Sequence, residues 1–179
     1  MSEAAGAQTP PMGRIRTHSD RIRPVGGEVA VREARGGDVA AAAAAVGALL
    51  DELGGEGPSA AELEAATRKL IEDPELGALL VADAGGEIVG VLAASWQHAV
   101  HVPGRYGVVQ DLWVSPEWRS QAIGRDLLEA LAALAREQGV ARLEVGLPQD
   151  SFAAIEATRA FYLANDFAPL GPRMRRLLS

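Results

Sequence analysis

The segment Asp111–Leu128 constrains the fold of this 179-residue chain more than any other. It begins with an apolar, strand-like run, Leu112–Val114, which Ser115 and Pro116 interrupt. A loop of mostly small residues follows, and apolar residues then recur at helical spacing. A strand that leads through such a loop into a helix presents unpaired backbone N–H groups and the helix dipole to an anion. The segment therefore predicts a site for a pyrophosphate group.

Periodicity and turn residues predict an ordered series of helices and strands in the rest of the chain. Asp38 is placed to cap one helix, Ser59 and Glu62 match a capping box, and Gly139 is placed to end a third helix. The expected strands are 29–32, 77–82, 88–96, 106–114, 140–146, a short one at Phe167 and 174–178; the expected helices are 38–53, 59–72, 122–138 and 148–165, with a loop at 97–105. Strands interleaved with helices indicate a mixed sheet covered on both faces.

Composition excludes several classes of function. The chain has no Cys, which rules out disulfides, thiolate chemistry and Cys-based zinc sites. Its three histidines, His18, His98 and His101, do not form a metal-ligand spacing with nearby acids, so we expect no metal. There is no apolar run of membrane-spanning length and no signal-peptide pattern, so we expect a cytoplasmic protein that does not act at a membrane.

Charge is distributed unevenly. Residues 36–172 hold 20 Asp or Glu against 8 Lys or Arg, which argues against nucleic acid as a partner. The acids favour a cationic acceptor such as an amine, although solvated helix faces explain the same pattern. Residues 1–27 are rich in Pro and Gly and poor in apolar side chains, so we expect a disordered tail there and a single domain over 28–179.

Several segments resemble the GNAT superfamily of acetyl-CoA-dependent N-acetyltransferases. The loop Arg119–Gly124 resembles the family's Arg/Gln-x-x-Gly-x-Gly/Ala motif, and the preceding residues 111–118 are similar to its fourth strand and turn. Residues 160–167 resemble its Phe-Tyr-x-x-x-Gly-Phe segment, and residues 81–90 its second hairpin. The resemblance implies an α+β, three-layer fold, with a mixed, mostly antiparallel sheet of six to seven strands flanked by four helices. It also implies that the sheet splays between its fourth and fifth strands to admit the cofactor.

The resemblance further implies which residues bind acetyl-CoA. The main chain of Leu112, Trp113 and Val114 would bond the pantetheine arm as an added strand, and an N–H there would polarise the acetyl carbonyl. The pyrophosphate would lie on the loop formed by Arg119, Ser120, Gln121, Ala122, Ile123, Gly124 and Arg125. Ala122 stands where the family usually has Gly, and a methyl group fits there if φ is negative. An ordinary β–α turn with a surface arginine is the alternative.

Two residues are candidates for the chemistry. By resemblance, Tyr162 protonates the leaving thiolate of coenzyme A, and a core aromatic role is the alternative. The identity of the general base is left open. Gln110 occupies the usual carboxylate position and cannot accept a proton. Asp111, on the opposite face of the expected strand, could accept a proton directly or through water, or could instead pair with an Arg. Glu117 is a further candidate. Ile155 replaces an Asn that often contacts the cofactor, and Asp166 replaces the usual Gly.

The resemblance predicts acetyl transfer to an amine by direct attack in a ternary complex. The acceptor would be a small-molecule amine or a protein amine, and a homodimer would be compatible with the family. Candidate acceptor-binding residues are Asp51, Glu52, Glu56, Trp96, Gln97, His98 and His101. A non-catalytic acyl-CoA sensor on the same fold is one alternative; a different nucleotide-binding α/β domain, which would bind a dinucleotide instead of a CoA ester, is another.

Overall fold

The computed structural model describes residues 28–54 and 57–171. Five strands form one sheet in the spatial order β1 (Ala30–Glu33), β2 (Gly77–Asp83), β3 (Ile88–Ala99), β4 (Val102–Val114) and β5 (Val140–Val145). The first four strands pair antiparallel, and β4 and β5 pair parallel. The sheet is therefore mixed and mostly antiparallel, which confirms the predicted fold class.

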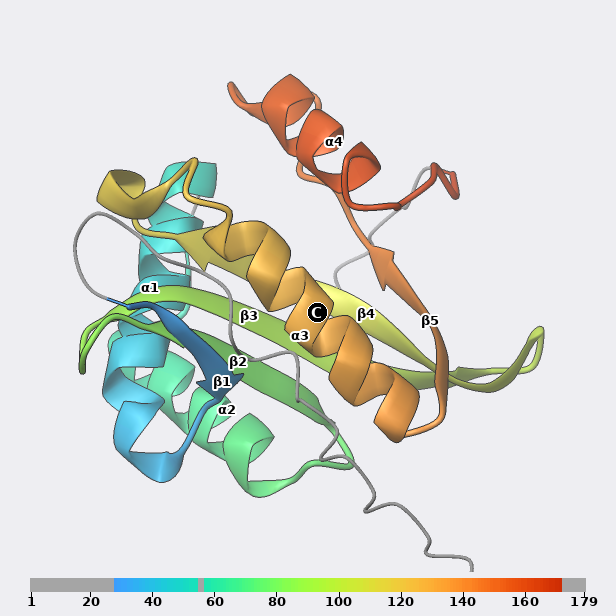
Figure 1. The fold of residues 1–179 in the computed structure, drawn as a ribbon, viewed down its shortest axis with the longest axis horizontal. Coiled ribbons are helices and arrows are strands. Elements are labelled where there is room, and N and C mark those ends of the chain that lie inside the picture. Colours follow the sequence, from blue (N-terminus) through green and yellow to red (C-terminus); the bar gives the residue numbers. More distant parts are fainter. Residues whose placement is uncertain (1–27, 55–56, 172–179) are drawn as a thin grey trace, which may run out of the picture.

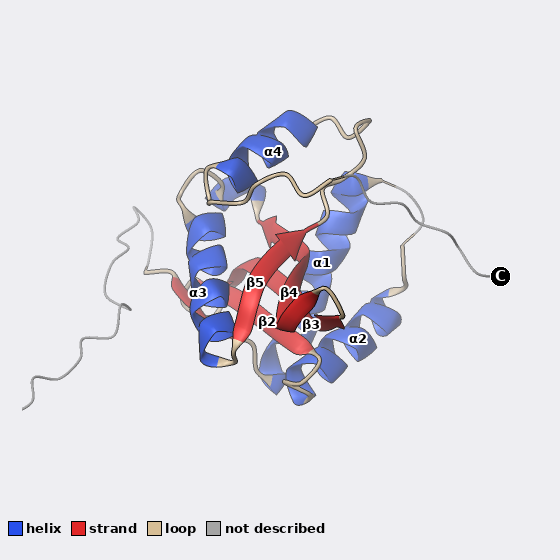
Figure 2. Ribbon diagram, turned by 90° about the vertical axis from the view of Figure 1, so that its right-hand side faces the viewer, coloured by secondary structure: helices blue, strands red, loops and turns tan. Residues whose placement is uncertain are grey.

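The helices complete three layers (Figures 1 and 2). Two of them, α1 (Val39–Leu53) and α2 (Ala60–Glu72), cover one face of the sheet, and α3 (Ile123–Glu137) covers the other. The fourth helix, α4 (Ile155–Leu163), lies beyond the end of the sheet toward which β5 runs. Figure 1 shows β4 and β5 side by side at one end and diverging as they approach α4.

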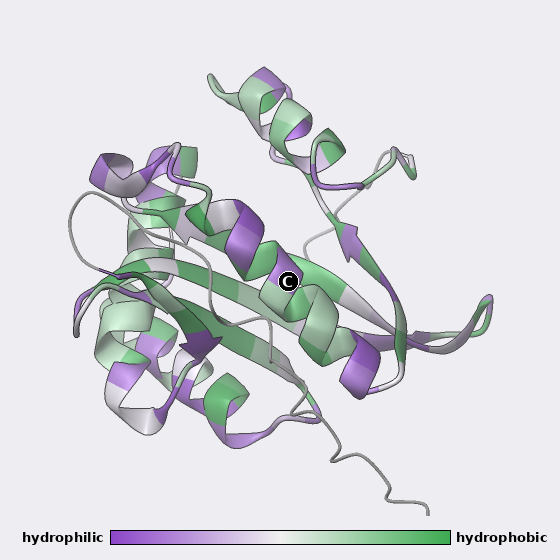
Figure 3. Ribbon diagram, viewed as in Figure 1, coloured by the Kyte–Doolittle hydropathy of each residue, from purple (hydrophilic) through white to green (hydrophobic). Residues whose placement is uncertain are grey.

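Apolar side chains fill both spaces between helices and sheet. Leu92, Leu127 and Leu131 are fully buried on the α3 side, and Val81 and Val91 on the α1 side. Figure 3 shows the corresponding pattern, with hydrophobic strands in the middle and hydrophilic patches on the outward faces of the helices. Burial of each large side chain contributes about 1.5–3 kcal/mol, which makes these two layers the main source of stability.

The local signals read from the sequence are largely confirmed. Ser59 and Glu62 form a reciprocal capping box at the start of α2. Gly139 follows α3 with φ of 69°, the conformation expected of a glycine that ends a helix. The turn at Asp83–Gly86 joins β2 and β3, and the Asp83 carboxylate accepts a hydrogen bond from the Gly86 N–H at 2.6 Å.

Asp38 is the N-cap residue of α1, as predicted, but its side chain makes no capping hydrogen bond. Its carboxylate instead accepts two hydrogen bonds from the Arg32 guanidinium at 2.7 and 3.0 Å, and Arg32 also pairs with Asp83 at 2.8 Å. The hydrogen bonds from Arg32 hold the pKa of both carboxyls below the ordinary value. The carboxylate also accepts the Arg35 backbone N–H at 2.7 Å, so its oxygens are engaged by Arg32 and Arg35 and not by the first turn of α1.

Three other expectations were wrong. Residues 97–105 are not a loop, because β3 and β4 continue as a hairpin to a tight turn at Val100 and His101. The last helix begins at Ile155, after a series of turns over 150–154, and Phe167 lies in no strand. The strand expected at 174–178, which would complete a sheet of six or more strands, and the tail expected at 1–27 fall outside the described residues.

Candidate active site

The central feature of the site is an open edge of β4. Pairing with β5 ends at Val109, whereas pairing with β3 continues to Val114. The Ser115 N–H donates to the Val89 carbonyl of β3. Because backbone groups alternate sides along a strand, the N–H and C=O groups of Leu112 and Val114 point away from β3, toward the gap left by β5. The splayed sheet implied by the family resemblance is present.

A β-bulge at Gln110 changes which face the next residues occupy. Asp111 aligns with Ala93 and Val109 with Ala94, so Gln110 is an extra residue in β4. The Gln110 side chain donates to the Ser95 hydroxyl at 2.8 Å. Ser95 and Ala93 lie two residues apart and share a face of β3, so Gln110 and Asp111 lie on that same face. The expectation that they lie on opposite faces was wrong.

The loop before α3 has two residues in the left-handed region. Ser120 and Ala122 have φ values of 64° and 65°, so the condition that φ is negative at Ala122 is not met. Ala122 is the N-cap of α3, and its methyl side chain cannot accept a capping hydrogen bond. The N–H groups of Ile123, Gly124 and Arg125, in the first turn of α3, therefore have no intrahelical partner. The first intrahelical bond runs from the Asp126 N–H to the Ala122 carbonyl at 3.0 Å. This geometry can bind an anion.

Helix α4 meets this loop through its aromatic residues. A Cβ atom on Gly124 would lie 3.2 Å from the Phe161 ring, so the glycine allows α4 to approach the start of α3. Tyr162 is buried and packs edge-to-face between Phe161 and Phe167, with ring centroids 5.2 and 5.3 Å away. The neighbouring turn is closed by Asp166, which adopts φ of 65° where the family usually has Gly.

The structure brings Tyr162 and Asp111 within electrostatic range of each other. Burial, together with the negative charge of Asp111, raises the pKa of Tyr162 to about 12. Burial also raises the pKa of the half-buried Asp111 carboxyl. Among the ion pairs of the described chain none involves Asp111, so the alternative that it pairs with an Arg is not realised. The site thus holds a neutral phenol and a carboxyl whose affinity for a proton is increased.

Arg119 does not project freely toward a phosphate. Its Nη2 pairs with Glu52 Oε1 at 2.6 Å, and its Nε donates to the Val114 carbonyl at 2.9 Å. The same Glu52 oxygen accepts the indole N–H of Trp113 at 2.9 Å. Glu52, at the end of α1, therefore joins β4 to the loop, and no local sequence signal indicated this. Arg125 is the more exposed arginine of the loop, with a 3.5 Å contact to Asp126.

The remaining candidates divide between the site and other parts of the fold. Glu117 is exposed and binds the Ser115 hydroxyl, which lowers the pKa of its carboxyl and makes it a poor base. Trp96 is buried in the α3-side core, so it cannot reach an acceptor on the other face. His98 and His101 are exposed at the end of the β3–β4 hairpin, and Glu56 lies outside the described residues.

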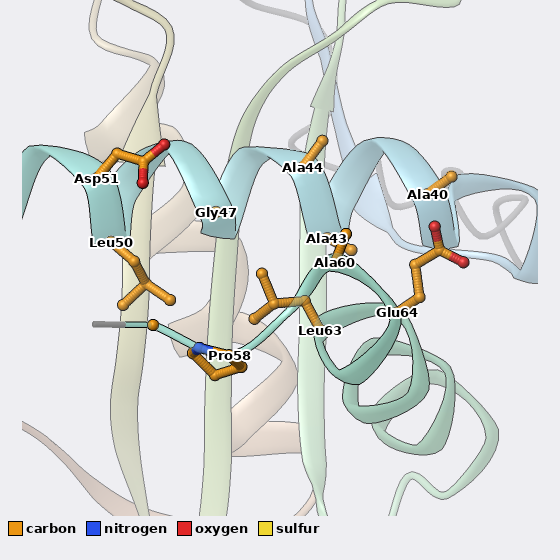
Figure 4. A pocket seen from close by; sticks show the side chains of 11 residues that line it. Ala40, Ala43, Ala44, Gly47, Leu50, Asp51, Pro58, Ala60, Leu63 and Glu64 are labelled. Atoms are coloured by element: carbon orange, nitrogen blue, oxygen red, sulfur yellow. The ribbon is translucent and has the colours of Figure 1, made fainter. Parts of the chain in front are cut away.

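Asp51 lines a separate pocket of about 380 Å³ between α1 and α2 (Figure 4). The walls are mainly small or apolar, with Leu50, Pro58 and Leu63 near one end and Glu64 near the other. The lining residues come only from α1, α2 and the segment between them, so this pocket does not include the open edge of β4.

Two kinds of site are not found within residues 28–54 and 57–171. No group of three or more His, Cys, Asp or Glu side chains is arranged to hold a metal ion. No helix in these ranges is long and apolar enough to cross a membrane.

Comparison with known proteins identifies the family. The model of the acetyltransferase (GNAT) family matches residues 47–163, well over half of the chain, and the protein belongs to this family. A relative, "IAA acetyltransferase" from Azospirillum brasilense, is 36% identical over 95 residues, which are 52% of this chain and 60% of that protein. The chain therefore spans less than two thirds of that relative's length.

Solved structures agree on the fold. A possible acetyltransferase from Clostridium difficile 630 superposes with a TM-score of 0.72 at 16% identity, covering 84% of this chain and 97% of the other. An aminoglycoside N-acetyltransferase in complex with CoA superposes with a TM-score of 0.71 at 14% sequence identity, covering 88% of this chain and 99% of the other. A ribosomal-protein-alanine N-acetyltransferase from Brucella melitensis superposes with a TM-score of 0.67 at 19% sequence identity, covering 85% of this chain and 100% of the other.

Replacement of Ala122 by glycine should stabilise the protein. A left-handed conformation costs a non-glycine residue about 1–2 kcal/mol, and the greater freedom of glycine in the unfolded chain offsets about 0.4–1 kcal/mol of the gain. We expect Ala122→Gly to raise the free energy of unfolding by about 1 kcal/mol, measured by urea denaturation. The same change at exposed Ala133, inside α3, should lower it by about 1 kcal/mol. A loss of stability in Ala122→Gly would contradict the left-handed geometry of the loop.

Proposed function

We propose that this protein transfers the acetyl group of acetyl-CoA to a primary amine, by direct attack of the amine on the thioester within a ternary complex. The observation that carries the proposal is the open edge of β4 at Leu112 and Val114, which follows Asp111, together with the Tyr162 hydroxyl on which the Asp111 charge acts and the N-terminus of α3 next to Val114. Membership of the acetyltransferase (GNAT) family supports acetyl-CoA as the donor. The absence of Cys from the sequence supports direct attack over a thioester-linked acyl-enzyme.

The bound donor would use backbone groups for most of its contacts. Within the described residues no partner is seen for the Leu112 C=O or the Val114 N–H, and these two groups would pair with the amides of the pantetheine arm, as an added strand would, while the Leu112 N–H would face the acetyl carbonyl. The Val114 carbonyl is not counted among the groups that would bind the pantetheine arm, because it already accepts a hydrogen bond from the Arg119 side chain. The pyrophosphate would lie on the N–H groups of residues 121–125, with Arg125 supplying positive charge. Arg119 would then act on the loop rather than on the phosphate.

The chemical step follows from the two shifted pKa values. As the amine nitrogen attacks the acetyl carbon, the Leu112 N–H would stabilise the charge that develops on the carbonyl oxygen. Asp111 would accept the proton released by the amine, directly or through a water. When the C–S bond breaks, the Tyr162 hydroxyl would give its proton to the sulfur. Transfer of the proton from Asp111 to the tyrosinate, directly or through water, would restore both groups.

Tyr162→Phe should separate catalysis from binding. We expect kcat to fall by about 10²-fold, because the leaving thiolate loses its acid, while the Kd for acetyl-CoA measured by calorimetry changes less than twofold. The other tyrosine of the chain provides a matched control: Tyr106 stacks on Arg142 in the part of β4 that pairs with β5, and Tyr106→Phe should leave kcat unchanged. If kcat survives in Tyr162→Phe, or wild type binds acetyl-CoA without acetylating any amine, the non-catalytic sensor becomes the better account.

Asp111→Asn should affect rate and stability in opposite directions. Because burial raises the pKa of Asp111 in the folded state, its ionisation opposes folding, and stability is lost as pH rises from the unfolded value through the folded one. The Asn variant should therefore unfold at a higher temperature than wild type at pH 7 and lack this pH dependence. Its kcat should fall by about 10²–10⁴-fold, and the acidic limb of the pH–rate profile should disappear. A wild-type acidic limb retained in Asp111→Asn would assign the base to another group.

A further inference from the structure

Three polar side chains continue from Asp111 along the sheet face that α1 covers. Ser95 and Gln97 lie on β3 and Gln110 on β4, and we call these three residues the acceptor strip. Ala93, two residues before Ser95 on the same face, packs with Val91 and Ala42 in the apolar core under α1. The face therefore changes from apolar to polar beside Asp111. Ser95 and Gln97 are half-buried, and Gln110 is exposed.

The hydrogen bonds inside the acceptor strip leave acceptor atoms facing outward. The Ser95 hydroxyl oxygen accepts hydrogen bonds from Gln97 Nε2 at 2.9 Å and from Gln110 Nε2 at 2.8 Å. A hydroxyl carries a single proton, so at most one of the two amides could instead present its oxygen to Ser95. At least one glutamine side-chain carbonyl must therefore point away from Ser95. When both amide groups donate to Ser95, as in this structure, both carbonyl oxygens point away from it. Within the described chain neither Oε1 accepts a hydrogen bond from a side chain or backbone donor.

The charges around the acceptor strip indicate what kind of group these oxygens suit. The strip itself is neutral, and Asp111 is its only carboxyl neighbour along β4. Glu52, at the end of α1, is already committed to Arg119 and Trp113. Within the acceptor strip itself a second ammonium group would find no carboxylate, whereas an O–H or amide N–H would find a carbonyl oxygen of the right polarity.

We propose that the acceptor strip selects amines that carry a neutral second hydrogen-bond donor, and that the substrate class is therefore the amino alcohols, including hydroxylated amines such as aminosugars. The inference rests on the proposed acetyl transfer, because Asp111 marks the position of the reacting nitrogen. On one face of adjacent strands the Cβ atoms of opposite residues lie about 4.5–5.5 Å apart and those of diagonal residues about 7–8 Å or somewhat less, and a chain of three or four carbons between nitrogen and oxygen spans distances in this range. The selected hydroxyl accordingly lies about three to four carbons from the amine nitrogen.

Matched pairs of amines test the proposal, each pair differing only in OH against CH₃. The panel is 3-amino-1-propanol with butylamine, 4-amino-1-butanol with pentylamine, and 1,3-diaminopropane as the dication. We expect wild type to prefer the alcohol of each pair by about tenfold in kcat/KM, the size of one neutral hydrogen bond. The double variant Gln97→Ala/Gln110→Ala should reduce this preference to less than threefold and leave the Kd for acetyl-CoA unchanged. Gln138→Ala, at the far end of α3, is the matched control and should keep the wild-type preference.

A charge substitution extends the test without removing any packing. Gln110→Glu keeps the shape of an exposed side chain and gives the acceptor strip a carboxylate, so it should shift preference toward 1,3-diaminopropane. The proposal is overturned if wild type acetylates these amines but does not distinguish OH from CH₃, or if the preference persists in the double variant. Failure to acetylate any amine overturns both the proposed function and this inference, whereas turnover without selectivity overturns only the inference.

Discussion

The departure of β5 from β4 after Val109 is the constraint on which the rest of the structure depends. Backbone N–H and C=O groups beside a packed core need partners, and a strand with one neighbour leaves half of its groups without a strand partner. In β4 this affects Leu112 and Val114, since β3 satisfies the alternate residues. The protein itself supplies one partner, the Arg119 side chain on the Val114 carbonyl. A ligand that pairs like a strand can supply the others.

The arrangement of Glu52, Arg119 and Trp113 serves geometry more than stability. The ion pair is partly exposed, with Arg119 and Glu52 side chains 46% and 37% accessible, so its contribution to folding is about 0–1 kcal/mol. It nevertheless connects three elements: the end of α1, the end of β4 and the loop that leads to α3. That loop contains two left-handed non-glycine residues, Ser120 and Ala122, which an isolated loop would rarely adopt. Fixing Arg119 at its start restricts the alternatives open to the loop.

Much of this arrangement could be predicted from the sequence because it depends on local patterns. The capping box at Ser59, the amphipathic period of α3 and the glycine after it act over a few residues, and the structure confirms them. Tyr162 and Asp111 lie on different elements, α4 and β4, yet the charge of Asp111 acts on the Tyr162 hydroxyl. Their catalytic roles stay a prediction from the family motifs.

Other features could not be predicted because they depend on partners distant in the sequence. The bulge at Gln110 arises from the register between β3 and β4, and a single extra residue reverses the expected face of Asp111 relative to Gln110. The hairpin through 97–105 forms despite Pro103 and Gly104, because tertiary pairing overrides local propensity. Arg119 was expected at a phosphate, but Glu52, 67 positions earlier in the chain, provides a closer partner.

The most direct test of the account is amide hydrogen exchange, followed residue by residue by NMR while acetyl-CoA is added. We predict that the Leu112 and Val114 N–H groups become protected on binding, together with those of Ile123, Gly124 and Arg125. The Trp113 N–H, which points to β3, provides an internal control and should be protected both before and after addition. Saturable binding without a change at Leu112 and Val114, or no binding of acetyl-CoA, would contradict the assignment of the open edge of β4 as the donor cleft.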